Sequence, residues 1–530
     1  MPAERRSVRA AIWLRPFLVL FGTATALFLV SFFADRGDGE GARSLTELLL
    51  APNTESAMNT LGNVAEVVAA VLGVAITVVS IIVELAANRY TSRIAELFFR
   101  DPVNFIVMGF FVVSCVQCMW VILEFDPLFA PRIGTAITMV LMTVSLLALL
   151  PYFAYVFAFL NPAVVIDRIR AYANDAVSRL GPGARLDVVV QTQRDAADGV
   201  EQLSDVALNA IEGKDKGISM AAVDALRALA SRYMKDKGRL PETWFRMAGE
   251  ITRNPDFVSM SPQVLEEIGR RRTWFEMKVL RQYETIYAET LNKARDVNYR
   301  IAINTRQIAE QALAAADREV IDLAVKFFNT YLRATINAKD VRTAYNVLNQ
   351  YRLLGEAAVR AGAIDLAGDV AHHFKYYGQT AYGQKLPFIL EVAAYDLCGL
   401  CEIAHETRSA AHGALLRTFL EVDKESESHE QEQSLRGVRK AQVKLATYYL
   451  EKGDEPSARE IFEDMKGERP ERLASIRDEI LAIDTKDFWE IIDRGANFDY
   501  LPPSRKERMA EFFAWFGDRV PPPTKHDPAV

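Results

Sequence analysis

A line of small and polar side chains runs along one long apolar segment near the N-terminus. Its members are Asn63, Glu66, Ala70, Gly73, Thr77, Ser80, Glu84 and Asn88, and we call them the polar stripe. Steps of three or four residues place them on one face of a helix, while valine, isoleucine and leucine fill the other faces. A carboxylate at membrane depth costs roughly 2.5–3.5 kcal/mol. We therefore expect the polar stripe to face protein or water rather than lipid.

The polar stripe is compatible with three kinds of chemistry. Small residues such as Gly73, Thr77 and Ser80 let membrane helices pack closely and exchange hydrogen bonds. If copies of the helix surround a common axis, Glu66 and Glu84 form two carboxylate rings that attract cations. The third use is a proton or ion relay inside a single helix bundle. The sequence leaves these alternatives open.

A second group of reactive side chains lies in the C-terminal half. Cys398 and Cys401 are followed by His405 and His412. Structural zinc sites need four tetrahedral ligands, which one helix rarely supplies, so we expect packing residues and predict neither a metal nor a cofactor. The sequence also contains no phosphate-binding glycine loop, catalytic triad arrangement or metalloprotease helix. We therefore do not expect an enzyme.

The segments that must position the stripe are strongly apolar. Half of the 530 residues are hydrophobic, and they concentrate in runs over residues 17–33, 64–85, 105–124 and 133–160. Each run is near the ~20 residues that cross a bilayer as a helix. Residues 1–165 are thus predicted to form a four-span transmembrane domain. The first run should be a retained anchor, because bulky Phe32 stands where a signal peptide needs a small residue.

Arginine sets the predicted orientation, since no lysine precedes Lys214. Arginines cluster before the first run, between the second and third, and after the fourth, at Arg5, Arg6, Arg9, Arg15, Arg89, Arg93, Arg100, Arg168 and Arg170. Such clusters favour the cytoplasmic side, which predicts a multi-pass inner-membrane protein with both termini in the cytoplasm. Arg89, Arg93 and Arg100 are expected at the membrane interface. With no helix breaker before Pro102, the second helix should extend into the cytoplasm.

One stretch resembles a known family. It runs Ser80-Ile-Ile-Val-Glu-Leu-Ala-Ala-Asn-Arg-Tyr-Thr-Ser-Arg93, continues with Phe98-Phe-Arg-Asp101, and leads into an apolar span near Phe105. It is similar to the signature of a widespread family of predicted bacterial membrane proteins of unknown function, mainly over residues 60–170. The resemblance implies N-terminal spans followed by a helical soluble region. It implies no activity.

The rest of the chain has helical periodicity almost throughout, which predicts an all-α fold. We expect a juxtamembrane helical domain at residues 166–300, an irregular α-solenoid of tetratricopeptide-like hairpins at 301–515, and a disordered tail at 516–530. Three similar segments, at 339–348, 362–371 and 453–462, support helical hairpins, although their spacing is not constant. Residues 186–193 are the exception, with a pattern that suggests a short strand.

These patterns predict a homo-oligomeric channel or channel-like conduit, with the cytosolic helices as a vestibule or sensor. It should prefer cations if Glu66 and Glu84 face the pathway. The alternative is a membrane-anchored helical scaffold that recruits a protein partner on the concave side of the solenoid. Membrane lipid is an expected partner in both cases. The net charge of −7 gives no sign of a nucleic-acid partner.

Overall fold

The computed structural model describes most of the chain. It covers residues 54–89, 98, 101–126, 131–247, 249–423, 435–487, 494 and 497–520, together with Leu18, Phe21, Gly22, Thr25, Ala26 and Leu29. In these ranges every regular element is a helix and no strand occurs, so the predicted all-α fold is confirmed. Contacts divide the chain into two compact units, Met1–Ile169 and Arg170–Val530.

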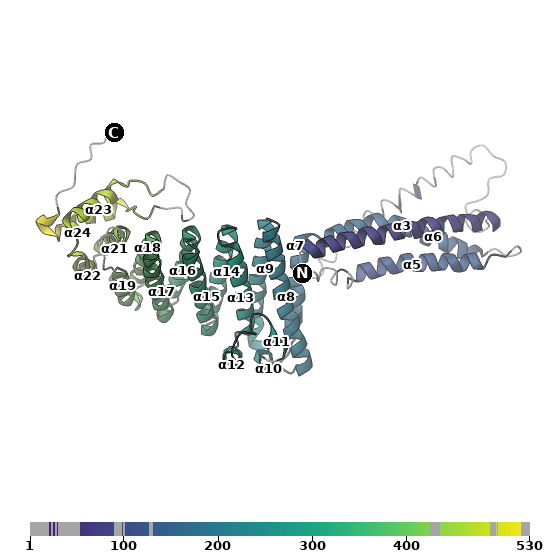
Figure 1. Ribbon diagram of the computed structural model, residues 1–530, viewed down its shortest axis with the longest axis horizontal. Helices are drawn as coiled ribbons and strands as arrows, with labels where there is room; N and C mark the ends of the chain where they lie inside the picture. Colours follow the sequence, from purple (N-terminus) through teal and green to yellow (C-terminus); the bar gives the residue numbers. More distant parts are fainter. Residues whose placement is uncertain are drawn as a thin grey trace, which may run out of the picture. The chain divides into compact units, whose positions relative to one another are not determined.

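Among its described residues, unit 1 contains three helices that are long and apolar enough to cross a membrane (Figure 1). They are α3 (Thr54–Arg89), α5 (Pro102–Leu123) and α6 (Arg132–Phe159), and each packs against the other two. The first of the four predicted spans lies mostly outside the described residues. The helix α3 has 36 residues, so it is about 54 Å long and exceeds the ~30 Å hydrocarbon core.

The helix α3 begins well before its apolar run, at Thr54, and is described as far as Arg89. The predicted extension beyond Arg89 lies outside the described residues. The helix α5 has a separate start, where the Asp101 side chain accepts a hydrogen bond from the Val103 backbone N–H at 3.0 Å and Pro102 occupies the first turn. These capping residues fix where the third predicted span begins.

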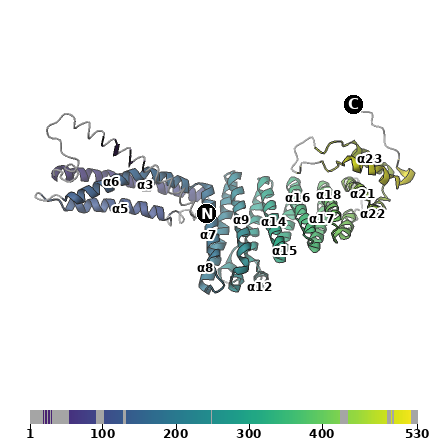
Figure 2. The same cartoon turned by 180° about the vertical axis from the view of Figure 1, so that it is seen from behind.

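Unit 2 is a row of helices that follow one another in chain order (Figures 1 and 2). The principal ones are α7 (Pro162–Ser178, which starts in unit 1), α8 (Leu186–Glu212), α9 (Lys216–Asp236), α13 (Trp274–Thr290), α14 (Arg295–Ala314), α15 (Arg318–Asn337), α16 (Val341–Arg360), α17 (Ile364–Gly383), α18 (Pro387–Glu406), α19 (His412–Leu420), α21 (Arg436–Lys452), α22 (Glu455–Met465), α23 (Pro470–Ala482) and α24 (Pro503–Ala514). Short helices α10 (Glu242–Phe245), α11 (Glu250–Arg253) and α12 (Pro262–Arg270) lie between α9 and α13.

Most long helices in this row contact both the next helix and the one after it. The helix α14 packs on α15 and α16, and α16 packs on α17 and α18. This pattern is that of an α-solenoid, in which each helical hairpin buries its apolar face against its neighbours. The helix α14 also packs on α9.

The middle of the solenoid is more regular than its sequence suggests. The five helices α14 to α18 each have 20 residues. They start at residues 295, 318, 341, 364 and 387, so each begins 23 residues after the last. In the three-residue linkers the second residue has positive φ, as at Ala316 and Lys339. The predicted irregular array is therefore regular over this part.

Two local expectations were wrong. Residues 186–193 form the first turns of α8 rather than a strand, because Val189, Ala196, Val200 and Leu203 continue a helical pattern of burial that outweighs the short valine run. Residues 516–520 are not a disordered tail, because Phe516 is buried and its ring lies 4.8 Å from that of Phe462. The remainder of the predicted tail, 521–530, lies outside the described residues.

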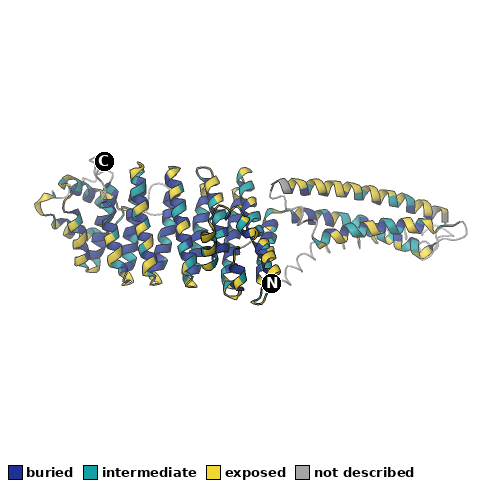
Figure 3. Ribbon diagram, turned by 60° about the horizontal axis from the view of Figure 1, so that its bottom comes forward, coloured by how far each residue is buried: buried dark blue, intermediate teal, exposed yellow. Residues whose placement is uncertain are grey.

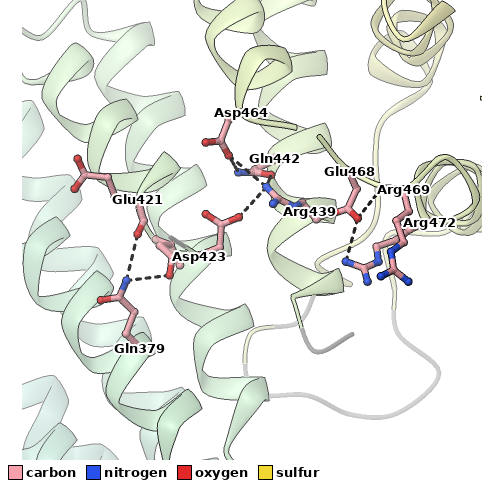
Figure 4. A network of polar contacts seen from close by, with 10 residues as sticks. Gln379, Glu421, Asp423, Arg439, Gln442, Asp464, Glu468, Arg469 and Arg472 are labelled. Carbon is pink, nitrogen blue, oxygen red and sulfur yellow. Dashed lines mark hydrogen bonds and ion pairs between the residues drawn. The ribbon is translucent and has the colours of Figure 1, made fainter. Parts of the chain in front are cut away.

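Charged side chains inside unit 2 form networks with partners on neighbouring elements. Arg439 of α21 binds Asp423 at 2.8 Å, Asp464 at 3.3 Å and Glu468 at 3.1 Å (Figure 4). Lys278 of α13 is fully buried and contacts Glu201 of α8 at 2.7 Å. Buried charges without such partners would be strongly destabilising, so these networks hold neighbouring helices in register.

Candidate functional site

The polar stripe lies on the face of α3 that the other described helices leave uncovered. All seven described stripe residues are exposed along this face: Asn63, Glu66, Ala70, Gly73, Thr77, Ser80 and Glu84. The opposite face is buried and contains Leu61, Val68, Ala75, Val79, Val83 and Ala86. The helix α3 therefore packs on α5 and α6 through its apolar side. Exposed residues along the helices of unit 1 are visible in Figure 3.

The local geometry of the stripe agrees with an open face. A Cβ atom built on Gly73 would meet no neighbouring atom of the described chain within 4 Å. The Thr77 hydroxyl donates to the Gly73 carbonyl oxygen at 2.9 Å, inside the same helix. The small residues of the stripe thus do not pack against α5 or α6. Close packing of membrane helices was one of the three uses that the sequence suggested for them.

The two stripe carboxylates are widely separated. Glu66 and Glu84 lie 18 residues apart on one helix, which corresponds to about 27 Å along its axis. This separation is close to the ~30 Å thickness of the hydrocarbon core, so both carboxylates can lie near its two boundaries. Such an arrangement avoids the cost of a charge at the midplane.

Four other predicted site residues lie beyond what the structure describes. Asn88 and Arg89 belong to the last turn of α3, but their side chains lie outside the described part of the chain. Arg93 and Arg100 fall in residues that the structure does not describe. Their predicted positions at the membrane interface remain predictions.

A polar seam between α5 and α6 was missed by sequence reasoning. The Ser145 hydroxyl donates to the Ser114 hydroxyl at 3.1 Å, and both side chains are fully buried. Nearer the start of α5, Tyr152 donates to the Asn104 Oδ1 atom at 3.2 Å. Ser114 and Ser145 belong to different apolar runs, and Asn104 directly precedes the run that contains Ser114. The sequence shows each of these polar residues in or beside an apolar run, but it does not show which residue is its partner.

An ion pair lies at the same end of the spans as Asn104. Arg168 of α7 contacts the Asp101 carboxylate at 3.0 Å, and its guanidinium lies 4.0 Å from the centre of the Phe159 ring. Asp101 also caps α5. Arg168 was predicted only as one of the arginines that set orientation. The structure adds that, within unit 1, Arg168 contacts the residue that caps α5.

The cysteine and histidine group in unit 2 forms part of the solenoid core. Cys398 and Cys401 are buried, free thiols, and burial raises the pKa of both. His405 lies 3.2 Å from the Tyr448 hydroxyl through Nδ1, and His412 lies 2.7 Å from the Tyr449 hydroxyl through Nε2. Within the described residues no group of three or more histidine, cysteine or acidic side chains is arranged to hold a metal.

Part of the chain matches the model of a known protein family. No curated protein matches the chain. A solved structure described as a circular tandem repeat protein with novel repeat topology and enhanced subunit contact surfaces is similar at 17% identity and a TM-score of 0.30, covering 62% of this chain and 81% of that one. Residues 9–189 match the model of the family described as "Predicted membrane protein (DUF2254)", so the suspected resemblance to an uncharacterised membrane family is confirmed and the chain is a membrane protein.

Proposed function

We propose that this membrane protein is a homo-oligomeric channel, in which the polar stripe of α3 from each copy lines a shared aqueous pathway. The observation that supports this proposal is the position of the stripe, which α3 turns away from α5 and α6. If the stripe faced lipid, the polar residues between Glu66 and Glu84 would have only hydrocarbon around them. Facing a common axis, they form two carboxylate rings about 27 Å apart and favour cations.

The arginine clusters suggest how the channel is oriented. In an inner membrane with both termini in the cytoplasm, Glu84 lies at the cytoplasmic end of the pathway and Glu66 at the outer end. The solenoid is then cytoplasmic and forms a vestibule or sensor. Gly73 and Thr77 lie between the two rings, where their small side chains leave room for ions.

Cysteine accessibility tests whether the stripe meets water. Thr77→Cys should react with a charged, membrane-impermeant thiol reagent, because Thr77 faces the aqueous pathway in this proposal. Val78→Cys is the matched control, since Val78 is the next residue of α3, is also exposed, and lies off the stripe. Labelling must be compared with the native protein, which has four free cysteines. Equal protection of both variants would contradict the proposal.

Conductance tests the function itself. In planar bilayers with a KCl gradient, the reversal potential of the native protein should show that cations are preferred over chloride. Glu84→Gln or Glu66→Gln should shift the reversal potential toward zero. Glu124→Gln is the control, because Glu124 is an exposed carboxylate at the end of α5 that is not part of the stripe. A folded native protein without conductance under voltage, membrane tension or varied pH would refute a channel.

The subunit number separates the channel from the scaffold. A mass measurement of the native protein in mild detergent should give a multiple of the 59.4 kDa chain. A strict monomer would exclude a pore shared between copies. A monomer without conductance that captures a specific cellular protein through its solenoid would instead support the membrane-anchored scaffold.

A further inference from the structure

A cavity in the membrane-spanning unit shares only Ser80 with the polar stripe. It has a volume of about 300 Å³ and lies between α3, α5 and α6. Ile76 and Val79 contribute from α3, Met108 and Val112 from α5, and Tyr152 from α6. This volume is at the lower end of the range for ligand-binding cavities, which often form between the helices of a bundle. We call it the interhelical groove.

The groove has an apolar wall and a fixed polar floor. Tyr152 and Asn104 form the floor, and both are almost completely buried. Tyr152 donates to Asn104 Oδ1 at 3.2 Å, while Asn104 Nδ2 donates to the Phe98 carbonyl oxygen at 2.5 Å. Both side chains therefore already donate inside the protein. What the groove offers to a ligand is mainly hydrocarbon surface.

Aromatic residues connect the polar floor of the groove to the ion pair between Arg168 and Asp101. The Phe98 ring packs edge-on against Phe159 at 5.2 Å, and the Arg168 guanidinium lies 4.0 Å from the Phe159 ring centre. Arg168 is in turn bound to Asp101. The groove thus begins where charged residues mark the end of the spans, and it continues along the apolar part of α5.

The opening of the groove lies on the outer, apolar surface of the spans. Val112 is 53% exposed and Phe105, which also lines the groove, is 80% exposed. The described residues of the first apolar run do not line it, and Leu18, Phe21 and Leu29 of that run are themselves exposed. Water gains little in such a groove because the polar floor is already satisfied. The medium at this depth supplies a better occupant, a hydrocarbon chain.

We infer that the interhelical groove binds one acyl chain of a bilayer phospholipid, with the headgroup at the end of the spans marked by Asp101 and Arg168. The chain lies between α3 and α5 and covers Ile76, Met108 and Val112. It buries apolar surface that these helices leave open, and burial of such surface is what favours binding. The site is separate from the polar stripe except at Ser80, which belongs to both.

The first test fills the groove. Val112→Trp places a large ring in it, whereas Val113→Trp places the same ring on the neighbouring exposed position of α5, which does not line the groove. Native mass spectrometry with added dioleoyl phosphatidylglycerol should show one retained lipid per chain in the native protein and in Val113→Trp. Retention by Val112→Trp should be about tenfold weaker or less, since the ring occupies the space of the acyl chain. Equal retention by the two tryptophan variants would overturn the inference.

The second test uses the native protein and does not depend on a variant that folds. Phosphatidylglycerol with a photoreactive diazirine in its acyl chain is irradiated with the reconstituted protein, and the labelled peptides are mapped. Labels should concentrate on Ile76, Met108 and Val112. Labels spread evenly over exposed positions such as Val113 and Met119 would show only the surrounding bilayer and refute the site.

The first test has one further outcome that contradicts the inference. If Val112→Trp changes the oligomeric mass but not lipid retention, a second copy of the chain fills the groove and the inference is wrong.

Discussion

At the scale of residues, two adjacent histidines of α17 lie in different environments. The His373 Nδ1 atom is 2.9 Å from the Tyr351 hydroxyl, and His373 is partly buried, whereas His372 is exposed. Desolvation lowers the pKa of His373 from its ordinary 6.5, the nearby His372 adds to this, and Asp369 opposes it. In the unfolded chain the His373 imidazole therefore binds a proton near pH 6.5, whereas in the folded chain it binds that proton only at lower pH. The free energy of unfolding should fall as the pH decreases through this value.

The prediction is that His373→Gln makes the stability of the solenoid less sensitive to acid. Chemical unfolding followed by circular dichroism in mildly alkaline and mildly acidic buffer, on either side of the ordinary histidine pKa, measures this difference. In the alkaline buffer the variant should lose about 1 kcal/mol, because the contact with Tyr351 is weakened. His372→Gln is the matched control and should keep most of the native pH dependence. An identical acid response in native protein and His373→Gln would contradict the burial of His373.

The sequence predicts which residues share a face of one helix, but it does not predict which polar residues contact each other between helices. The spacing of Glu66, Thr77 and Ser80 gave their common helical face correctly, since neighbours on a helix surface are set by positions three and four apart. The contact between Ser114 and Ser145 joins residues 31 positions apart, and that between Asp101 and Arg168 joins residues 67 apart. No local pattern pairs such residues.

At the scale of elements, the repeated turn explains why α14 to α18 are equal in length. Helices in this array end with backbone hydrogen bonds that close a left-handed turn, for example from Asp317 N–H to the Ala312 carbonyl oxygen at 2.9 Å. Asp317 and Asp340 then cap the next helix by accepting from a backbone N–H three residues on. The turn signals were present in the sequence. Because lysine and alanine occupy some of the left-handed positions, a search for glycine and proline did not reveal the period.

Close helix contact in this array makes one glycine sensitive. A Cβ atom at Gly355 of α16 would lie 3.0 Å from Leu400 of α18 and 3.1 Å from Val370 of α17. We expect Gly355→Val to destabilise the protein by about 1–3 kcal/mol through overpacking. Gly368→Ala is the control, because a Cβ atom placed there would meet no atom of the described residues within 4 Å and alanine favours the helix by up to about 1 kcal/mol.

Thermal unfolding measured by circular dichroism checks this pair. The midpoint should fall for Gly355→Val and stay equal or rise for Gly368→Ala. If both substitutions have the same effect, the close approach of α16 to α17 and α18 is not what makes Gly355 sensitive.

At the scale of the whole molecule, the chain consists of a membrane unit and a solenoid with its own core. Trp244, Trp274 and Tyr283 are fully buried in the solenoid, and the paired Lys278 joins α13 to α8. We expect residues 162–520, expressed without the spans, to fold as a helical protein with a cooperative thermal transition. Far-UV circular dichroism and calorimetry test this expectation. A fragment that is helical but melts without cooperativity would show that the solenoid needs the membrane unit.

The sequence by itself determined that this is an all-helical chain with apolar spans at its N-terminus and a helical array after them. Those properties follow from periodicity and run length, which are local along the chain. Only the tertiary structure decided that the polar stripe of α3 faces away from α5 and α6, that a polar seam joins α5 to α6, and that a groove remains beside them. A helix presents every face to its surroundings, and which face is covered depends on contacts between residues far apart in the sequence.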